Sequence, residues 1–306
     1  MGYRYVTLDV FTDRPFGGNP LAVLPDARGL SDEQMRHIAR EFNYSETTFV
    51  LPPDDPALTR KVRIFTPAHE LPFAGHPNIG TAVALASLGE LGDPDGLRAD
   101  PAIVFEGGAG PVPITIRFEG DRPVAAELTA PVNGEVGDEV DCEQVAEAVS
   151  LSQEAITTAH HPPRIASAGI AFLCVELAGR DALAAARSAA VVAEEMQQAL
   201  GVEGFFLYTR DTGAPGVDFR ARMYAPAHGI PEDPATGSAN ACLAGLLATL
   251  DPVSDGTLTW RVAQGVEMGR PSLIDLAVDK TDGAISAIRV AGGAVIVCRG
   301  EMDVPG

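Results

Sequence analysis

Residues 65–72 read FTPAHELP and residues 224–231 read YAPAHGIP, an ungapped match with four identities and two conservative replacements in eight positions. After the match, the first copy continues FAGHPNIGTAVALASLGEL and the second continues EDPATGSANACLAGLLATL. Each copy passes from a turn rich in Gly and Pro into a charge-free segment rich in Ala and Leu. The chain therefore contains two related halves, and this repeat decides the fold.

Both charge-free segments are predicted to be helices with defined ends. The first ends near Gly92, Asp93 and Pro94, and the second ends near Asp251 and Pro252. A helix that is apolar on every side is buried on every side, and roughly 14 to 16 residues are too few to span a bilayer. We therefore expect the rest of each half to surround its helix.

Strand-like segments fill much of the chain outside these two helices. They are YRYVTLDVF, LAVLP, TTFVLPP, VRIFTP, AIVFE and VPITIRFE in the first half, and AFLCVEL, GFFLYTR, FRARMYAP, LTWRVAQG, LIDLAVD and ISAIRVAGGAVIVC in the second. Amphipathic helices are predicted at 31–42, 141–150 and 181–201. The predicted fold class is α+β, with two pseudo-symmetric domains, each a curved β-sheet or barrel around one central buried α-helix.

The domains are predicted to divide at the middle of the chain, into 1–130 and 131–285. The boundary falls near AAELTAPVNGEVGDEV (125–140), where Pro, Asn and Gly interrupt the strand pattern. The last strand, about 286–306, is predicted to complete the first domain.

Composition excludes several classes of function. The 306 residues carry 42 acidic and 22 basic side chains, for a net charge of -20, with no basic cluster that would follow a phosphate backbone. We therefore expect no nucleic-acid partner. The N-terminal sequence has no signal-peptide layout, so we expect a cytoplasmic protein with no membrane partner. The four cysteines form no C-x-x-C pair, which favours free thiols over a metal site.

The two copies differ immediately after the match. The first has Gly75 and His76 before its helix. The second has a charged pair followed by hydroxyl residues and glycine: Glu232, Asp233, Thr236, Gly237 and Ser238. A site shared by two halves would produce such an asymmetry at matched positions. The alternative is that Asp233 and Ser238 only cap their helix, but Pro234 already suits a helix start and leaves Asp233 to face a cleft.

The first turns of the two buried helices are candidate anion sites. Helix N-termini carry unpaired backbone N–H groups and a partial positive charge. If both point into an interdomain cleft, they would hold a small acid from two sides. Gly75 and Gly237 would let the backbone approach that acid closely.

Glu46 is the candidate general acid or base. It lies in FNYSETTFV (42–50), among apolar and hydroxyl neighbours, where burial would raise its pKa toward neutrality and suit proton transfer in both directions. The alternative is an ordinary loop carboxylate. Other chemistries find little support, since there is no Gly-rich phosphate loop, no G-x-S-x-G around Ser238 and no H-E-x-x-H.

With these residues in view, the sequence resembles the PhzF (phenazine biosynthesis) family, which shares the diaminopimelate epimerase fold. The resemblance covers nearly the whole chain. Its five motifs are GGNPLAV (17–23), FNYSETTFV (42–50), RIFTPAHELPFAGHPNIGTA (63–82), RARMYAPAHGIPEDPATGSA (220–239) and QGVEMGRPS (264–272). The resemblance implies an active site in the cleft between the two domains, a homodimer, and no cofactor.

The resemblance also assigns roles to residues. It makes Glu46 the acid/base, and it implies that His76, Asp233 and Ser238 contact the substrate. We predict Glu46, His76 and Asp233 as catalytic residues and no metal. The predicted substrate-binding residues are Gly75, Thr236, Gly237 and Ser238. In epimerase and racemase relatives two cysteines face each other at the helix entrances. The matching positions here are Gly75 and Asp233, which exclude a two-thiol racemase.

The predicted function is a cofactor-independent isomerase that moves a proton within a small carboxylic acid. The resemblance implies a substrate of the trans-2,3-dihydro-3-hydroxyanthranilate type, as in phenazine biosynthesis. One alternative is an isomerase or epimerase of another small amino or hydroxy acid. A second alternative is a non-catalytic member of the family that binds a metabolite or a protein.

Overall fold

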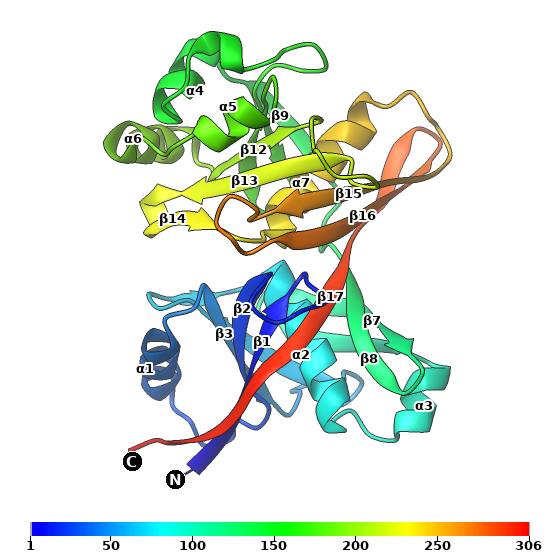
Figure 1. The fold of residues 1–306 in the computed structure, drawn as a ribbon. Coiled ribbons are helices and arrows are strands. Elements are labelled where there is room, and N and C mark those ends of the chain that lie inside the picture. Colours follow the sequence, from blue (N-terminus) through cyan, green and yellow to red (C-terminus); the bar gives the residue numbers. More distant parts are fainter. Residues whose placement is uncertain (1, 306) are drawn as a thin grey trace. The chain divides into compact units, whose positions relative to one another are not determined.

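The computed structural model describes residues 2–305, which separate into two compact units (Figure 1). Unit 1 extends to Pro131 and resumes at Ala291, and unit 2 is Val132–Val290. The last strand, β17 (Ala284–Asp303), contributes residues to both units.

The described residues of unit 1 form three helices, and every strand except β17 comes from one continuous stretch of the chain. The helices are α1 (Asp32–Phe42), α2 (Gly75–Leu88) and α3 (Pro94–Ala99). The strands are β1 (Gly2–Val10), β2 (Asn19–Leu24), β3 (Glu46–Leu51), β4 (Arg60–Phe65), β5 (Glu70–Leu71), β6 (Ala102–Gly107), β7 (Gly110–Glu119) and β8 (Arg122–Thr129), with the part of β17 from Ala291.

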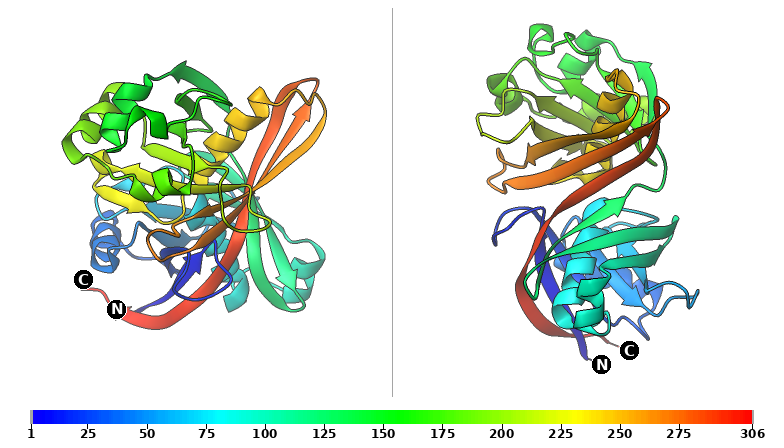
Figure 2. Two further views of the ribbon diagram at one scale, coloured as in Figure 1. Left: turned by 45° about the horizontal axis from the view of Figure 1, so that its top comes forward. Right: turned by 90° about the vertical axis from the view of Figure 1, so that its right-hand side faces the viewer.

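The strands of unit 1 close into a barrel around α2. Each strand pairs with the next in the order β1, β2, β3, β4, β6, β7, β8 and β17, and β17 pairs again with β1. In Figure 2 the red β17 runs beside the dark blue β1. Helix α2 packs against β1, β2, β3, β7 and β8, and every residue from Gly75 to Leu85 is buried. The missing charges of α2 follow from this position, because a charged side chain on any face would be desolvated.

Helix α1 places the start of β3. Ser31 caps its N-terminus in a reciprocal capping box with Gln34, and Met35 and Ile38 bury its apolar face. Asn43 ends the helix in the left-handed conformation. The chain then enters β3 at Glu46, so that helix stop and strand start together fix the position of this glutamate.

Unit 2 repeats this plan with a larger helical insertion. Its helices are α4 (Cys142–Ala148), α5 (Arg180–Ala185), α6 (Ala190–Leu200) and α7 (Gly237–Leu250), with short 3₁₀ turns η1 (Gln153–Ala155) and η2 (Pro226–His228). Its strands are β9 (Glu135–Glu139), β10 (Arg164–Ser167), β11 (Ala171–Glu176), β12 (Phe205–Thr209), β13 (Phe219–Ala225), β14 (Ile230–Asp233), β15 (Gly256–Gln264) and β16 (Ser272–Thr281), with the part of β17 up to Val290.

The strand order of unit 2 matches that of unit 1. The paired series β9, β10, β11, β12, β13, β15 and β16 corresponds to β17, β1, β2, β3, β4, β6 and β7. Helix α7 packs against β9, β10, β11, β15 and β16. The predicted α+β fold, with a buried helix in each of two pseudo-symmetric parts, is confirmed.

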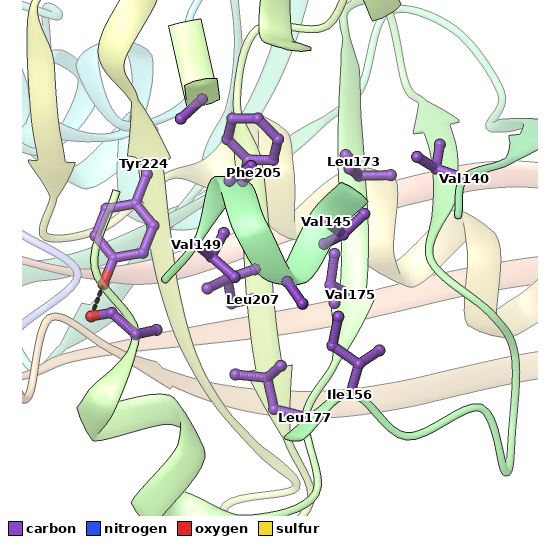
Figure 3. Close-up of a cluster of buried hydrophobic side chains, with 14 of the residues drawn as sticks. Val140, Val145, Val149, Ile156, Leu173, Val175, Leu177, Phe205, Leu207 and Tyr224 are labelled. Atoms are coloured by element: carbon purple, nitrogen blue, oxygen red, sulfur yellow. Dashed lines mark hydrogen bonds between the residues drawn. The ribbon is translucent and has the colours of Figure 1, made fainter. Parts of the chain in front are cut away.

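An apolar cluster holds the helical insertion of unit 2 against its sheet (Figure 3). Val145 of α4 and Val149, which follows the helix, meet Leu173 of β11 and Leu207 of β12, all of them fully buried. Burying a side chain of this size stabilises a fold by about 1.5–3 kcal/mol. The cluster occupies one face of the strands, and α7 packs against the other face.

The helix predicted at 181–201 is wrong in its length, because the chain breaks between α5 and α6. The N–H of Arg187 donates to the carbonyl of Val149 at 3.0 Å, and that of Ala189 donates to the carbonyl of Ala148 at 2.9 Å. The Ala-rich composition favours one continuous helix. The backbone bonds to the end of α4 take residues out of it, a tertiary effect that local propensity does not contain.

The segment 125–140, predicted as a linker, consists mostly of strand. Residues up to Thr129 belong to β8 and those from Glu135 belong to β9. Strand β9 is almost entirely exposed, so it has no apolar alternation for a sequence pattern to reveal. It forms because β10 offers its backbone as a partner.

Candidate active site

The first candidate region lies at the start of α2 in unit 1. We call it the α2 entrance: the first turn of α2 with Glu46. Glu46 opens β3 and His76 is the second residue of α2. The Oε2 atom of Glu46 lies 3.3 Å from Nε2 of His76, and their side chains are only 12% and 5% exposed. No local sequence pattern predicts this contact, because the two residues come from separate elements.

A third polar side chain sets the state of His76. Asn19, the first residue of β2, places Nδ2 at 3.5 Å from Nδ1 of His76. An amide nitrogen is a donor, so Nδ1 accepts and the hydrogen of a neutral imidazole sits on Nε2, the atom that faces Glu46. Burial lowers the pKa of His76 to about 3. The ring is therefore neutral at physiological pH, and its contact with Glu46 is not an ion pair.

The buried Nε2 of His76 has no hydrogen-bond partner among residues 2–305, because its contact with Glu46 lacks hydrogen-bond geometry. Leaving a polar atom buried in this way costs about 1–3 kcal/mol. A buried polar atom without a partner is typical of a site that binds a polar ligand atom.

The backbone of the α2 entrance adds donors. Gly75 is the first helical residue and is buried. In the described chain, no side chain caps this N-terminus, and its first turn holds no acidic residue. The N–H groups of a first turn have no partner within the helix and attract negative charge.

The second candidate region lies at the start of α7 in unit 2. We call it the α7 entrance: the first turn of α7 with Asp233 and Thr236. Asp233 is the last residue of β14 and is 5% exposed. The hydroxyl of Thr236, the N-cap residue, donates to Oδ2 of Asp233 at 2.5 Å. Gly237 begins the helix and is buried, and Ser238 follows it and is half-buried.

The capping role that the sequence left open for Asp233 and Ser238 does not describe α7. The N-cap residue is Thr236, and its side chain makes no capping bond to the helix in the part of the chain that the structure describes. Its hydroxyl turns to Asp233 instead. The first N–H groups of α7 are thus not consumed by an N-cap side chain.

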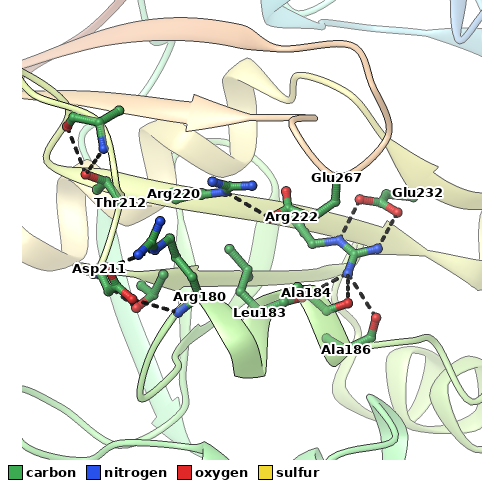
Figure 4. Close-up of polar contacts among 12 residues, drawn as sticks. Arg180, Leu183, Ala184, Ala186, Asp211, Thr212, Arg220, Arg222, Glu232 and Glu267 are labelled. Atoms are coloured by element: carbon green, nitrogen blue, oxygen red, sulfur yellow. Dashed lines mark hydrogen bonds and ion pairs between the residues drawn. The ribbon is translucent and has the colours of Figure 1, made fainter.

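Glu232, the neighbour of Asp233, has a structural partner (Figure 4). Arg222 of β13 donates to both of its oxygens at 2.8 Å, in a bidentate pair. The same guanidinium donates to the carbonyls of Leu183 and Ala186 at 2.9 and 3.0 Å. Glu232 therefore ties β14 to β13 and to the end of α5, and this pair supports the strand that ends at Asp233.

Among residues 2–305, no group of three or more His, Cys, Asp and Glu side chains is arranged to hold a metal ion. In the same range, no helix has the length and apolar character needed to cross a membrane.

No role in these two regions was predicted from the sequence for three polar residues: Asn19, Arg222 and Gln264. Each belongs to a quoted motif, GGNPLAV, RARMYAPAHGIPEDPATGSA or QGVEMGRPS. Each is buried within a strand. A polar residue inside an otherwise apolar strand pattern was the available signal.

The chain was compared with known proteins. Residues 8–300 match the family described as phenazine biosynthesis-like protein. The chain is 37% identical over 305 residues to an uncharacterized isomerase of Mesorhizobium japonicum, covering 98% of this chain and 99% of that protein. It is 36% identical over 299 residues to the trans-2,3-dihydro-3-hydroxyanthranilate isomerase of Pseudomonas aeruginosa, covering 98% and 99%.

The fold is also similar to a crystal structure. The PhzF-family phenazine biosynthesis protein of Bacillus anthracis aligns with a TM-score of 0.89 at 24% identity, covering 99% of this chain and 100% of that one. At this identity the likeness shows the fold alone.

The relatives named isomerases match over the full length of the chain, and the protein is an isomerase with a diaminopimelate epimerase-like fold. It belongs to the PhzF family of phenazine biosynthesis-like proteins.

Proposed function

We propose that the protein is a cofactor-independent isomerase that moves a proton within a small carboxylic acid, with Glu46 as the general acid and base. The observation that carries this proposal is the buried contact between Glu46 and neutral His76 at 3.3 Å. A carboxylate that is largely shielded from solvent and lies beside a neutral donor is suited to accept a proton and to return it.

The chemical step conserves atoms and electrons. Glu46 takes a proton from an activated carbon of the substrate, and the π bonds of the conjugated system shift. The same carboxyl group then delivers a proton to another carbon of that system and regains its charge. Substrate and product are isomers, so the step consumes no oxidant, reductant or second substrate.

The other residues bind and polarise the substrate. His76 offers its buried Nε2–H to a polar atom of the substrate, and Asp233 accepts from an amino or hydroxyl group. The backbone around Gly75 and Gly237, with Thr236 and Ser238, holds the substrate carboxylate. Each donor aimed at developing charge contributes on the order of 2.7–4 kcal/mol to lowering the barrier.

The proposed substrate is of the trans-2,3-dihydro-3-hydroxyanthranilate type. Support comes from the isomerase of Pseudomonas aeruginosa that carries this name and shares 36% of its residues with this chain. Such a molecule presents a carboxylate, an amino group and a hydroxyl group, which suit the donors and acceptors of the two entrances. Another small amino or hydroxy acid is the second candidate, since a relative with 37% identity is an isomerase whose substrate its name leaves open.

The test is turnover of trans-2,3-dihydro-3-hydroxyanthranilate in heavy water by the wild type and Glu46→Gln. We expect wild-type turnover with solvent deuterium in the product, and a fall of about 10²–10⁴-fold in kcat for the variant. The matched control is Glu119→Gln, which changes an exposed glutamate of β7.

Three results would contradict parts of the proposal. Undiminished turnover by Glu46→Gln removes Glu46 from the mechanism. Turnover of a different amino or hydroxy acid in its place transfers the proposal to the second candidate. Binding of every tested acid without turnover favours a non-catalytic member.

A further inference from the structure

A buried network of two side-chain amides and the Thr236 hydroxyl lies beside Asp233. Its centre is Gln264, the last residue of β15, whose side chain is fully buried. Its Oε1 accepts from the backbone N–H of Thr236 at 3.1 Å and from Nδ2 of Asn240 at 2.9 Å. Its Nε2 donates to the backbone carbonyl of Asp233 at 2.9 Å and to the Thr236 hydroxyl at 3.0 Å.

The chemistry of these partners fixes the orientation of the Gln264 amide. The backbone N–H of Thr236 can only donate, and the backbone carbonyl of Asp233 can only accept. The reverse orientation would face donor to donor and acceptor to acceptor, at a buried position where each unmade bond costs about 1–3 kcal/mol. Both hydrogens and both lone pairs of the amide are used.

This orientation determines where the Thr236 hydroxyl points its hydrogen. The Oγ1 atom already accepts from Gln264, so its own hydrogen is directed to Oδ2 of Asp233 at 2.5 Å. This distance lies in the range of a charge-assisted O–H···O⁻ bond. The bond favours the ionised carboxylate and holds it in one rotamer.

Unit 1 has no such network at the corresponding place. Gln264 pairs with Ala221, three residues before the tyrosine that opens the second repeat copy. In unit 1 the register of β4 and β6 runs through Lys61 and Glu106, and the next position of β6 is Gly107. A glycine has no side chain with which to reach α2. The amide network is therefore a feature of the α7 entrance and not of the fold that the two units share.

We propose that Gln264 is a positioning residue of the reaction, which acts by turning the Thr236 hydroxyl onto Asp233 and so holds this carboxylate as a hydrogen-bond acceptor. The inference rests on the proposed function, in which Asp233 meets the substrate. It specifies that Asp233 receives a donor group of the substrate, an amino or hydroxyl group. The four hydrogen bonds of the Gln264 amide go to Asp233, Thr236 and Asn240.

The first test does not depend on turnover. Protein labelled with ¹³C at the aspartate side-chain carboxyl is titrated by NMR, and Asp233→Asn identifies the Asp233 signal. In Thr236→Val we expect the midpoint of Asp233 to rise by about one pH unit or more, since a hydrogen bond to a charged group is lost. Thr236→Ser restores the wild-type value. Gln264→Met, which adds no charge and no longer donates to the Thr236 hydroxyl, reproduces the rise.

The comparison between these variants separates the effect of the Thr236 hydroxyl on the Asp233 midpoint from the effect of nearby charges. The charged groups on β13, on β14 beside Asp233, and in the loop after β15 are Arg222 with Glu232, Arg220 with Glu267, and Arg270. None of these variants changes them. The matched control is Thr249→Val, since this hydroxyl lies later in α7 and donates to the carbonyl of Gly245. We expect it to leave the midpoint unchanged.

The second test is a double-mutant cycle on kcat with the proposed substrate. We expect Thr236→Val and Gln264→Met each to lower kcat by about tenfold or more, and the double variant to lose little beyond either one. An unchanged midpoint in Thr236→Val, or additive losses in the cycle, overturns the inference. A wild type that turns over no acid contradicts the proposed function instead, and the titration then decides alone whether Gln264 orients Thr236.

Discussion

The α2 entrance and the α7 entrance share a backbone and differ in their chemistry. Asn78 and Asn240 are each the fourth residue of their helix, and each Nδ2 donates to the carbonyl of its N-cap residue. The distances are 2.8 Å to Ala74 and 2.9 Å to Thr236. A bond that recurs in both units, with the same atoms, belongs to the architecture of a buried helix start.

An arginine–glutamate pair recurs in the same way. Arg63 donates to both oxygens of Glu70 at 2.7 and 2.6 Å, as Arg222 does to Glu232. Arg63 and Arg222 occupy equivalent positions, each two residues before the aromatic residue that opens its repeat copy. Glu232 therefore has the structural task of tying down a short strand, in spite of its place next to Asp233.

The differences begin one residue further along that short strand. Leu71 of β5 lies opposite Ile64, and Asp233 of β14 lies opposite Met223. Ile64 and Met223 are equivalent in the repeat. The carboxylate of the α7 entrance thus stands where unit 1 has a leucine.

At a second pair of equivalent positions, on the neighbouring strand, unit 1 carries the reactive residue and unit 2 does not. Glu46 comes directly before the residue that pairs with Phe65, and Gly204 comes directly before the residue that pairs with Tyr224. A Cβ atom on Gly204 would lie 2.5 Å from the carbonyl oxygen of Tyr224, so unit 2 has no room for a side chain there. The duplicated backbone is common to both units, and each unit carries a reactive group where the other is inert.

The largest expected effect comes from making the α7 entrance resemble the α2 entrance. Asp233→Leu installs the residue that unit 1 carries at this register position. We expect kcat to fall by about 100-fold or more, as for loss of one catalytic group, with the helical and sheet content retained by circular dichroism. The reciprocal Leu71→Asp, at a half-buried position outside the proposed site, is the control and should keep activity within about twofold. Equal losses of kcat in Asp233→Leu and Leu71→Asp would contradict the proposal that the two positions differ in function.

The second prediction concerns the two arginine–glutamate pairs. Arg222 is 5% exposed and Glu232 15%, whereas Arg63 and Glu70 are 20% and 41% exposed. Removing one member of a buried pair costs about 3–5 kcal/mol, and a pair with more solvent contributes about 1 kcal/mol or less. We expect Arg222→Met to lower the free energy of unfolding in urea far more than Arg63→Met. A similar loss of unfolding free energy in Arg222→Met and Arg63→Met would show that burial does not determine how much each pair contributes to stability.

The smallest expected effect is a pH dependence of stability that belongs to unit 1. Burial lowers the pKa of His76 from 6.5 to about 3. Between these two pH values His76 is protonated in the unfolded chain and neutral in the folded chain. The stabilising contribution is complete above about pH 6.5 and is lost as the pH falls toward 3.

The measurement is urea unfolding between pH 4 and 7. His76→Ser places at this position the residue that α7 carries as Ser238, and it should flatten the slope by up to about 1.4 kcal/mol per pH unit. His161, whose pKa burial also lowers, lies in unit 2 and contributes the same slope to both proteins. Parallel curves for wild type and variant would contradict a buried neutral His76.

Much of this fold was predictable from local patterns. The uncharged segments that became α2 and α7 have no polar face, so only burial on all sides suits them. Helix α1 was equally clear, because its apolar spacing and its Ser31 cap are local. The break between α5 and α6 was not predictable, because backbone bonds to Val149 and Ala148 create it.

The sequence alone determined that the chain is a duplicated α+β protein with two buried helices, and it singled out Glu46, His76 and Asp233 as candidates. Those conclusions depend on residue type and spacing, which a sequence contains. Only the tertiary structure decided that Glu46 meets His76, that Arg222 neutralises Glu232, and that Gln264 orients Thr236 toward Asp233. Each of these contacts joins residues from separate elements, and their geometry arises from how strands pair and helices are enclosed.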